Sequence, residues 1–249
     1  MSVPERPCVL ISEDQQGVRM LRLNRPDKLN ALNTELTQAL YDALRSADRD
    51  GDIRSLVLAG EGRALCAGGD LSEFDQLTVD NWDAVAYRAE LTCQLQMTLQ
   101  RLKKPIVSVA QGVAMGGGAG LAIACDMMVV VKDLQFGYPE LKHSIVPAVV
   151  MTGLQRHFGR KLAFELISTG RILSGEELFE LGIANTVCED AKRACEVALT
   201  VARTWSQADP KALSATKELF YRIADLPFEA AMRAGRDMNM IMRNFREKA

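Results

Sequence analysis

Two glycine-rich segments and one glutamate are the parts of this sequence whose residue types suggest chemistry. The segments span residues 63–71 and 113–120, and the glutamate is Glu140. Glycine lets the backbone adopt unusual dihedral angles and approach a ligand closely. Both segments follow an expected strand, and the second leads into an expected helix, whose N-terminus favours an anion. Together they would form an oxyanion hole, although either one alone more often marks a tight turn or close strand–helix packing.

Several familiar sites are absent from the sequence. There is no G-x-S-x-G, no Gly-Lys dipeptide and no H-E-x-x-H, which excludes a hydrolase elbow, a Walker A loop and a zincin site. With two histidines, His143 and His157, and no C-x-x-C among six cysteines, we expect no metal site. The run Gly116–Gly120 does not fit the dinucleotide fingerprint, because its third glycine position falls on Ile123.

The bulk composition is that of an ordinary globular protein. Among 249 residues, 48% are hydrophobic and 25% charged, and the formal net charge is −2. This balance offers no basic surface for nucleic acid, and no apolar run is long enough to span a membrane. The first residues lack the apolar core of a secretory signal, so we expect a cytoplasmic protein with reduced cysteines.

The hydrophobic pattern predicts a mixed α/β body over residues 1–190 and a helical region over 191–249. Strands are expected near 9–11, 18–23, 56–59, 106–110, 127–131 and 183–187. Asn33 and Ser174 are expected helix caps, and Pro210 and Pro227 are expected in first turns. Helical spacing over 91–102 ends before Pro105. Periodicity alone predicts an ordinary parallel α/β sheet.

Five strings of residues, in this order, resemble the enoyl-CoA hydratase/isomerase (crotonase) superfamily. They are Asn24–Leu32 (NRPDKLNAL), Leu65–Leu71 (LCAGGDL), Ala114–Gly118 (AMGGG), Cys125-Asp126, and Phe136–Glu140 (FGYPE). Any one string is weak evidence for the family, whereas all five in this order are strong evidence. The resemblance implies an α/β fold, a crotonase-like spiral of ββα turns followed by a C-terminal α-helical trimerisation region. It also implies a homotrimer or homohexamer, with no cofactor beyond the CoA of the substrate.

The resemblance further implies which residues act. The backbone amides of Gly69 and Gly117 would hold the thioester oxygen of an acyl-CoA substrate, and Glu140 would be the catalytic acid/base. CoA would bind bent, with its adenine near 64–68. The substrate-binding candidates are Arg25, Lys28, Ala31, Ala64, Ala67, Gly68, Asp70, Leu71, Met115, Gly118 and Pro139, with Phe245 and Lys248 as further candidates for the CoA phosphates. Solvated loop charges are the alternative for Arg25 and Lys28.

The sequence departs from the family's hydratases at one position. Those enzymes place a first glutamate two residues after the glycine triplet, where this chain has Gly120. Two carboxylates suit water addition, because one prepares the water while the other handles the α-proton. A single carboxylate suits double-bond migration through an enolate, and some family isomerases have only this glutamate. We therefore expect isomerisation slightly ahead of hydration.

Other activities remain open. A family hydrolase of this pattern has an aspartate where this chain has Ala148, which disfavours hydrolysis. A non-catalytic acyl-CoA-binding protein and a decarboxylase of a malonyl-type thioester are the further alternatives. His143 is either a second acid–base group or a surface histidine, and Tyr138 either lines the pocket or belongs to the core. Asp70 and Asp126 are expected to bond loop N–H groups.

In this family the segment after Leu71 and the following helix contact the acyl group. The residues there are mostly apolar, which mildly favours a hydrophobic acyl chain, and Arg88 is a candidate partner for a substrate carboxylate. They are Phe74, Leu77, Trp82, Val85, Tyr87, Arg88 and Leu91.

Overall fold

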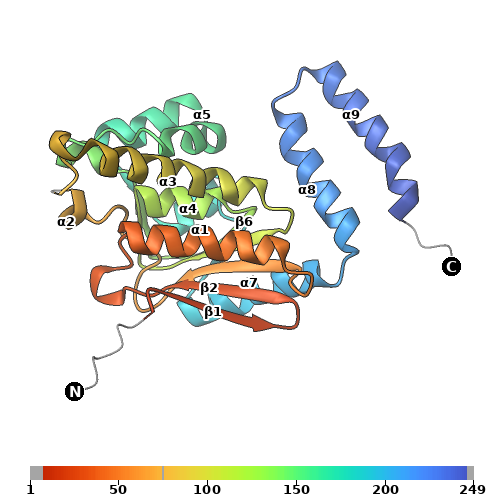
Figure 1. Ribbon diagram of the computed structural model, residues 1–249, viewed down its shortest axis with the longest axis horizontal. Coiled ribbons are helices and arrows are strands. Elements are labelled where there is room, and N and C mark those ends of the chain that lie inside the picture. The colour runs from red at the N-terminus through yellow and green to blue at the C-terminus, as the bar shows by residue number, and fades with distance from the viewer. Residues whose placement is uncertain (1–7, 75, 246–249) are drawn as a thin grey trace.

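A six-stranded sheet in the order β1-β2-β3-β4-β6-β9 lies at the centre of the computed structural model, which describes residues 8–74 and 76–245 (Figure 1). β1 and β2 pair antiparallel, and the other neighbours pair in parallel. The strands are β1 (Leu10–Gln15), β2 (Val18–Leu23), β3 (Ser55–Gly60), β4 (Ile106–Ala110), β6 (Met127–Val131) and β9 (Thr186–Cys188). The buried runs of β3 and β4 are typical of parallel strands covered on both faces.

Helices cover both faces of this sheet. Along β3, Leu56 and Leu58 belong to one apolar cluster and Val57 and Ala59 to the other, as the alternation of a strand requires. The first cluster is closed by α1 (Thr34–Arg49), α3 (Trp82–Arg101) and α4 (Gly117–Ala124), and the second by α7 (Ala191–Ser206). In Figure 1, α1 and α3 cross in front of the sheet.

A second sheet has three short strands, in the order β5-β7-β8. They are β5 (Val113–Met115), β7 (Gln135–Gly137) and β8 (Ile172–Leu173). The chain leaves β4 for β5 at Gly112, where φ is +59° and a Cβ would lie 1.9 Å from the carbonyl oxygen of Arg63. Only glycine fits this corner.

The two sheets and the helices repeat as a spiral. The chain runs through β4, β5 and α4, and then through β6, β7 and α5 (Val150–Thr169). One turn earlier, Cys66 takes the place of a small-sheet strand through a parallel bridge to Ala114. The spiral of ββα turns is therefore confirmed, and the single sheet predicted from periodicity alone is wrong. Strands of two or three residues are too short to produce an alternating pattern.

Most expected helix boundaries are confirmed. Asn33 caps α1 by accepting the Leu36 N–H, and Ser174 forms a capping box with Glu177 at the start of α6 (Gly175–Glu180). Pro210 is the first residue of α8 (Pro210–Ala224). Two other expectations are corrected by the structure.

Pro227 precedes α9 (Phe228–Ile241) instead of lying within its first turn. The strand expected at 183–187 is β9, at Thr186–Cys188, because the amides of Ile183 and Ala184 instead donate to the Leu178 carbonyl and close the turn after α6. The remaining short helices are η1 (Pro26–Lys28), α2 (Leu71–Phe74), η2 (Val79–Asn81), η3 (Glu140–His143) and η4 (Met242–Phe245).

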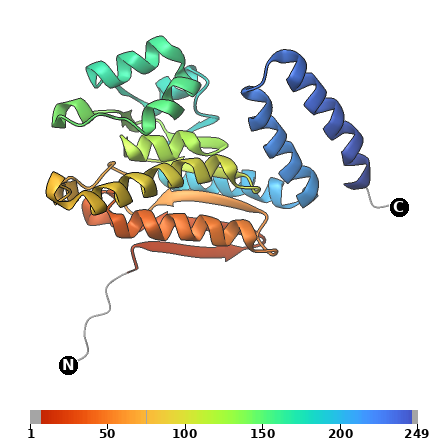
Figure 2. The same ribbon diagram turned by 45° about the horizontal axis from the view of Figure 1, so that its top comes forward.

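Helices α8 and α9 form a hairpin that extends away from the body (Figures 1 and 2). α7 packs on the central sheet, whereas α9 lies along α8. Large apolar side chains on the hairpin remain exposed, among them Phe220, Phe228 and Met240. No helix in the described ranges is long and apolar enough to cross a membrane. The cytoplasmic location and the division at residue 190 stay predictions.

A buried ion pair joins α8 to the body. Lys217 Nζ donates to Asp126 Oδ2 at 2.7 Å and to the Lys104 carbonyl at 3.0 Å, and Tyr221 donates to Asp126 Oδ1 at 2.8 Å. Asp126 also accepts the Ile106 N–H, so the expected structural role of this aspartate is confirmed. Since both charges are largely buried, removing one leaves the other without its partner.

Replacing Lys217 with methionine is expected to destabilise the protein by about 3 kcal/mol, because Asp126 is left buried without its ammonium partner. Urea unfolding followed by circular dichroism measures this change. Arg156→Met, which removes an ion pair exposed on both sides, serves as the control and is expected to cost less than about 1 kcal/mol. Equal losses in the two variants would contradict the role assigned to burial.

Candidate active site

The two glycine loops lie against each other at one end of the molecule. A Cβ on Gly68 would lie 2.9 Å from the Met115 carbonyl oxygen and 3.8 Å from the Gly117 nitrogen, and Gly68 has φ +98°. A Cβ on Gly118 would lie 2.3 Å from the Cys66 carbonyl oxygen. Side chains at these positions would force the loops apart, so glycine is what permits their close approach.

The neighbouring hydrogen bonds fix the direction of two backbone amides. The Gly68 carbonyl accepts the Leu32 N–H at 2.7 Å, and in a planar trans peptide the Gly69 N–H must then point the opposite way. The Gly116 carbonyl likewise accepts the Gly120 N–H at 2.9 Å inside α4. The Gly117 N–H, at the first position of that helix, therefore points outward from its N-terminus. Neither amide donates to a protein acceptor among the described residues.

The Glu140 carboxylate lies beside the second loop. A Cβ on Gly116 would lie 2.7 Å from Glu140 Oε1, and Gly116 has φ +49°. Glu140 Oε2 is buried without a hydrogen-bond partner. Burial raises the pKa of Glu140, opposed by a hydrogen bond from its own backbone and by His143. A carboxylate with a raised pKa beside two unpartnered amides is suited to proton transfer.

Both loops and the glutamate line one cleft of about 400 Å³. Most of its wall is apolar, and its polar side chains are Arg88, Thr92, Glu140 and His143. Of the described residues that line it, only Glu140 carries a carboxylate. No cluster of three potential metal ligands occurs in the described part of the chain. Burial raises the pKa of the nearby Cys66 thiol to about 12, so it is no nucleophile at neutral pH.

The structure brings together some of the residues proposed from the sequence. In the cleft lie Ala67, Gly68, Gly69, Leu71, Met115, Gly117, Pro139 and Glu140. Outside its lining lie Arg25, Lys28, Ala31, Ala64, Asp70 and Gly118. Among the acyl-side candidates, Phe74, Leu77, Val85 and Arg88 line the cleft, whereas Trp82 and Tyr87 are exposed elsewhere and Leu91 is in the core.

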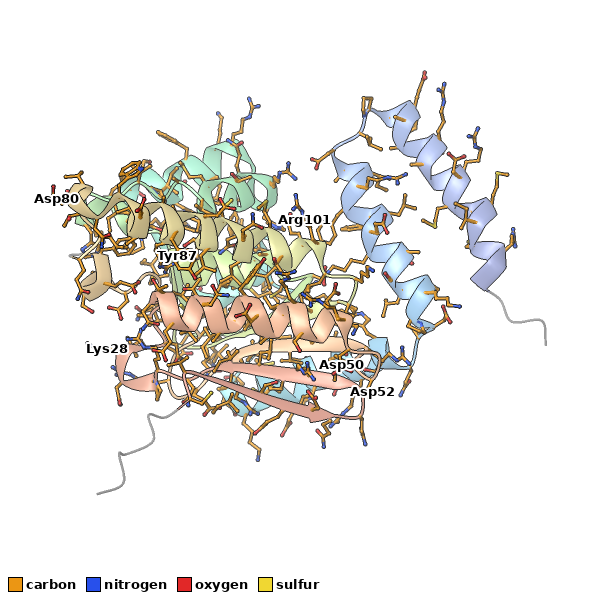
Figure 3. The ribbon with its side chains drawn as sticks, viewed as in Figure 1. Lys28, Asp50, Asp52, Asp80, Tyr87 and Arg101 are labelled. Atoms are coloured by element: carbon orange, nitrogen blue, oxygen red, sulfur yellow. The ribbon has the colours of Figure 1, made fainter. Side chains whose placement is uncertain are left out.

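Contacts explain the residues that lie outside the cleft. Arg25 pairs with Asp70 at 2.8 Å and also donates to the Ala31 carbonyl, so it holds the loop. Asp70 accepts the Ser72 N–H, as expected for a residue that bonds loop amides. Lys28 is exposed at the end of η1, before α1 (Figure 3). Lys248 lies outside the described residues. Tyr138 belongs to the core, and His143 is exposed at the cleft.

Apart from Ala148, sequence reasoning did not single out Leu32, Thr92 or the wall formed by 145–150. Leu32 is the last residue of the string 24–32 that resembles the family, but the resemblance assigns it no role. Thr92 follows Arg88 by one helical turn, a spacing that places both on one face of α3. The rest of the 145–150 wall has no sequence signal, because its residues are apolar and lack a regular period.

The space beside Gly120 is filled by two side chains. A Cβ there would lie 2.9 Å from Val150 Cγ1 and 3.0 Å from Gln96 Nε2. No described carboxylate replaces the glutamate that the family's hydratases have at this position. Ala148 also lines the cleft, so this wall contributes no second acid. The cleft thus combines two amide donors with a single carboxylate.

Comparison with known proteins identifies the family of this chain. A family model described as enoyl-CoA hydratase/isomerase matches residues 13–247. The chain is a member of the enoyl-CoA hydratase/isomerase family. A probable enoyl-CoA hydratase of Bacillus subtilis is 32% identical over 219 residues, covering 88% of this chain and 84% of that protein. The 2,3-dehydroadipyl-CoA hydratase of Escherichia coli is 31% identical over 230 residues, covering 92% and 88%.

Solved structures agree on the fold. An enoyl-CoA hydratase from Polaromonas superposes with a TM-score of 0.88 at 29% identity, covering 94% of this chain and 91% of that one. An enoyl-CoA hydratase from Mycobacterium smegmatis gives a TM-score of 0.86 at 29% identity, with the same coverage. The fold is that of the crotonase superfamily, and the family assignment makes an acyl-CoA the class of substrate to test.

The raised pKa of Glu140 predicts a pH profile for a member of this family that uses it as a base. Because burial disfavours the carboxylate, kcat/KM is expected to fall on the acid side with an apparent pKa above the ordinary 4.5. Initial rates measured from about pH 4 to about pH 9 at constant ionic strength would test this. An acid limb at or below the ordinary value would show that a different group limits the rate.

Proposed function

We propose that this protein is an enoyl-CoA isomerase that moves a double bond along the acyl chain of a CoA thioester. In this reaction the amides of Gly69 and Gly117 stabilise the thioester oxygen as it becomes an enolate. Glu140 removes a proton from one carbon and returns it to another. The observation that carries the proposal is the filled space beside Gly120, which leaves Glu140 as the cleft's one described carboxylate.

Hydration is the second candidate. It is favoured by the names of the relatives, which include enoyl-CoA hydratases of Bacillus subtilis and Escherichia coli. Hydration requires that a water molecule be held and deprotonated while the α-carbon receives a proton. With Val150 and Gln96 in the space of the first glutamate, both tasks would fall to Glu140. Migration needs only one carboxylate that takes and returns the same proton.

Incubation with trans-2-enoyl-CoA and trans-3-enoyl-CoA in deuterated water separates the two reactions. Isomerisation converts one enoyl thioester into the other without adding water. Deuterium enters the product only when the proton held by Glu140 exchanges with solvent before it is returned. Hydration produces a 3-hydroxyacyl thioester instead, which mass spectrometry distinguishes by the added water. We expect migration to be the faster reaction. A hydroxyacyl product formed faster than the isomer would overturn the proposal in favour of hydration.

We also propose that the chain assembles as a homotrimer, with or without doubling to a hexamer. The support is the hairpin of α8 and α9, which extends from the body with Phe220, Phe228 and Met240 exposed. Such a surface is costly for an isolated chain in water. Light scattering after size exclusion is expected to give about three or six times 27.4 kDa. A monomer at micromolar concentration would contradict this proposal.

A further inference from the structure

Leu32 connects the two glycine loops through three separate contacts. Its N–H donates to the Gly68 carbonyl at 2.7 Å, and its carbonyl accepts the Asp70 N–H at 3.1 Å, on either side of Gly69. Its Cδ1 lies 3.4 Å from where a Cβ on Gly117 would be. A shift of the Leu32 backbone would therefore rotate the peptide that presents the Gly69 N–H and loosen the contact with the second loop.

Arg88 of α3 fixes the Leu32 backbone by a hydrogen bond to its carbonyl. Its Nη2 donates to the Leu32 carbonyl at 2.8 Å, so that carbonyl accepts two hydrogen bonds. Nη1 donates to the Thr92 hydroxyl one helical turn away, and Nε donates to Glu73 Oε2 at 3.3 Å. Arg88 is only 7% exposed. A guanidinium held at three corners is a rigid donor.

Glu73 completes the network. Its two oxygens accept the Thr34 N–H at 2.9 and 3.0 Å, at the first residue of α1. The carboxylate thus ties Arg88 to the start of α1, a few residues after Leu32. Because Glu73 already neutralises Arg88, a substrate carboxylate placed beside this arginine would also lie near a like charge. The contacts favour a structural target for the guanidinium over a substrate group.

We propose that Arg88 is a positioning residue that holds the Gly69 amide in its catalytic orientation through the Leu32 carbonyl. The proposal rests on the proposed function, because it presumes that this amide stabilises an enolate oxygen. Donors in an oxyanion hole act only when they already point at the charge that develops. Misplacement by about 1 Å can cost about 10²-fold in rate. The residue therefore acts on the rate of enolate formation without contacting the reacting atoms.

The test compares Arg88→Met with Arg88→Lys and with a control, Arg19→Met. Arg19 is a partly buried arginine of β2 that pairs with Asp14 and Asp50, away from the cleft. The assay is deuterium exchange at the α-carbon of butyryl-CoA, a saturated thioester that forms the enolate without migration. Free CoA, which has no thioester oxygen, provides a separate measure of binding.

We expect Arg88→Met to lower the exchange rate by about 10- to 100-fold while the Kd for free CoA changes less than about twofold. Arg88→Lys is expected to recover part of the rate, because an ammonium group can still donate to a carbonyl. Arg19→Met is expected to exchange at the wild-type rate. The pH of half-maximal rate is expected to stay unchanged in all variants, because Glu140 is untouched.

Three outcomes would overturn the proposal. The first is wild-type exchange in Arg88→Met, and the second is an equal loss of exchange and of CoA binding. The third is a loss confined to thioesters with a carboxylate on the acyl group, which would make Arg88 a substrate ligand. If Arg88→Met does not fold, Arg88→Lys and Glu73→Gln decide, since wild-type rates in both would also overturn it. Absence of exchange in the wild-type protein would instead remove the proposed function, and this proposal with it.

Discussion

Replacing Glu140 with glutamine is expected to lower kcat for double-bond migration by about 10²- to 10⁴-fold, the range that a positioned acid–base group contributes. The amide has nearly the same shape as the carboxylate but cannot take a proton. The cleft has no other described carboxylate that could replace it. The loss should therefore be nearly complete for both the removal and the return of the proton.

Binding should survive this substitution. Glu140 contacts the loop at Gly116, while the two amide donors belong to Gly69 and Gly117, and the substitution leaves their backbone intact. Isothermal titration with butyryl-CoA, which has no double bond to migrate, measures this, and a Kd within about threefold of wild type is expected, equivalent to less than about 0.7 kcal/mol. Retained turnover with retained binding would exclude Glu140 as the acid/base. Lost binding would show that the residue maintains the cleft instead.

Glu140→Gln is also expected to change how the stability of the protein depends on pH. Burial raises the folded-state pKa of Glu140, so ionisation is less favourable in the folded protein than in the unfolded chain. The wild-type protein therefore loses stability as pH rises from the unfolded pKa to the raised folded pKa, and the lost part is not regained above it. Glu140→Gln lacks this dependence. Between these two pKa values, the free energy of unfolding of Glu140→Gln minus that of wild type should increase as pH rises. Urea titrations at several pH values would show this.

His143 is the group that most directly complicates this interpretation. It lines the cleft three residues after Glu140, and its charge lowers the pKa of that carboxylate. His143→Gln removes the charge without adding a base. If the histidine acts only through this electrostatic effect, the acid limb of the pH profile should move upward while the limiting rate is retained. A loss of the limiting rate comparable to that of Glu140→Gln would make His143 a second acid–base group.

How much of this could be predicted depended on what kind of signal each feature leaves in the sequence. The buried stripe of α1 and its Asn33 cap follow from helical spacing and local hydrogen bonding. The small sheet left no such signal, because β5 and β7 are three residues long and are defined by the corner at Gly112. The ββα spiral came from five matching strings and from no periodicity.

The site divides in the same way. Gly69, Gly117 and Glu140 could be named from their strings, and the structure places all three at one cleft. The role of Leu32 could not be predicted, because it depends on backbone groups that every residue has. The sequence shows Arg88 as a charge among apolar residues, but two of its three partners, Glu73 and Leu32, lie 15 and 56 positions away in the chain. Pairing at such separations depends on tertiary packing, which local pattern does not encode.

The Gly117 amide offers the sharpest test of the oxyanion hole, because its position in the helix tolerates the substitution that removes it. Gly117 is the first residue of α4, with Gly116 as the N-cap. Proline is well accepted at this position, since its missing N–H has no acceptor within the helix. Gly117→Pro would delete the donor while α4 is retained, and is expected to lower kcat by about 10²- to 10³-fold.

The matched control is Gly117→Ala, which keeps the N–H and adds only a Cβ. That Cβ would lie 3.4 Å from Leu32 Cδ1, an ordinary contact, so the alanine variant is expected to keep most of the activity. The comparison should be made on α-proton exchange of butyryl-CoA as well as on migration, because both pass through the same enolate. Equal rates in the proline and alanine variants, with both folded by circular dichroism, would exclude the Gly117 amide as a donor. Since the proline Cδ takes the place of that hydrogen, binding must be measured as well. A proline variant that binds butyryl-CoA with a Kd near wild type but loses exchange, while the alanine variant keeps it, would tie the rate to this backbone N–H.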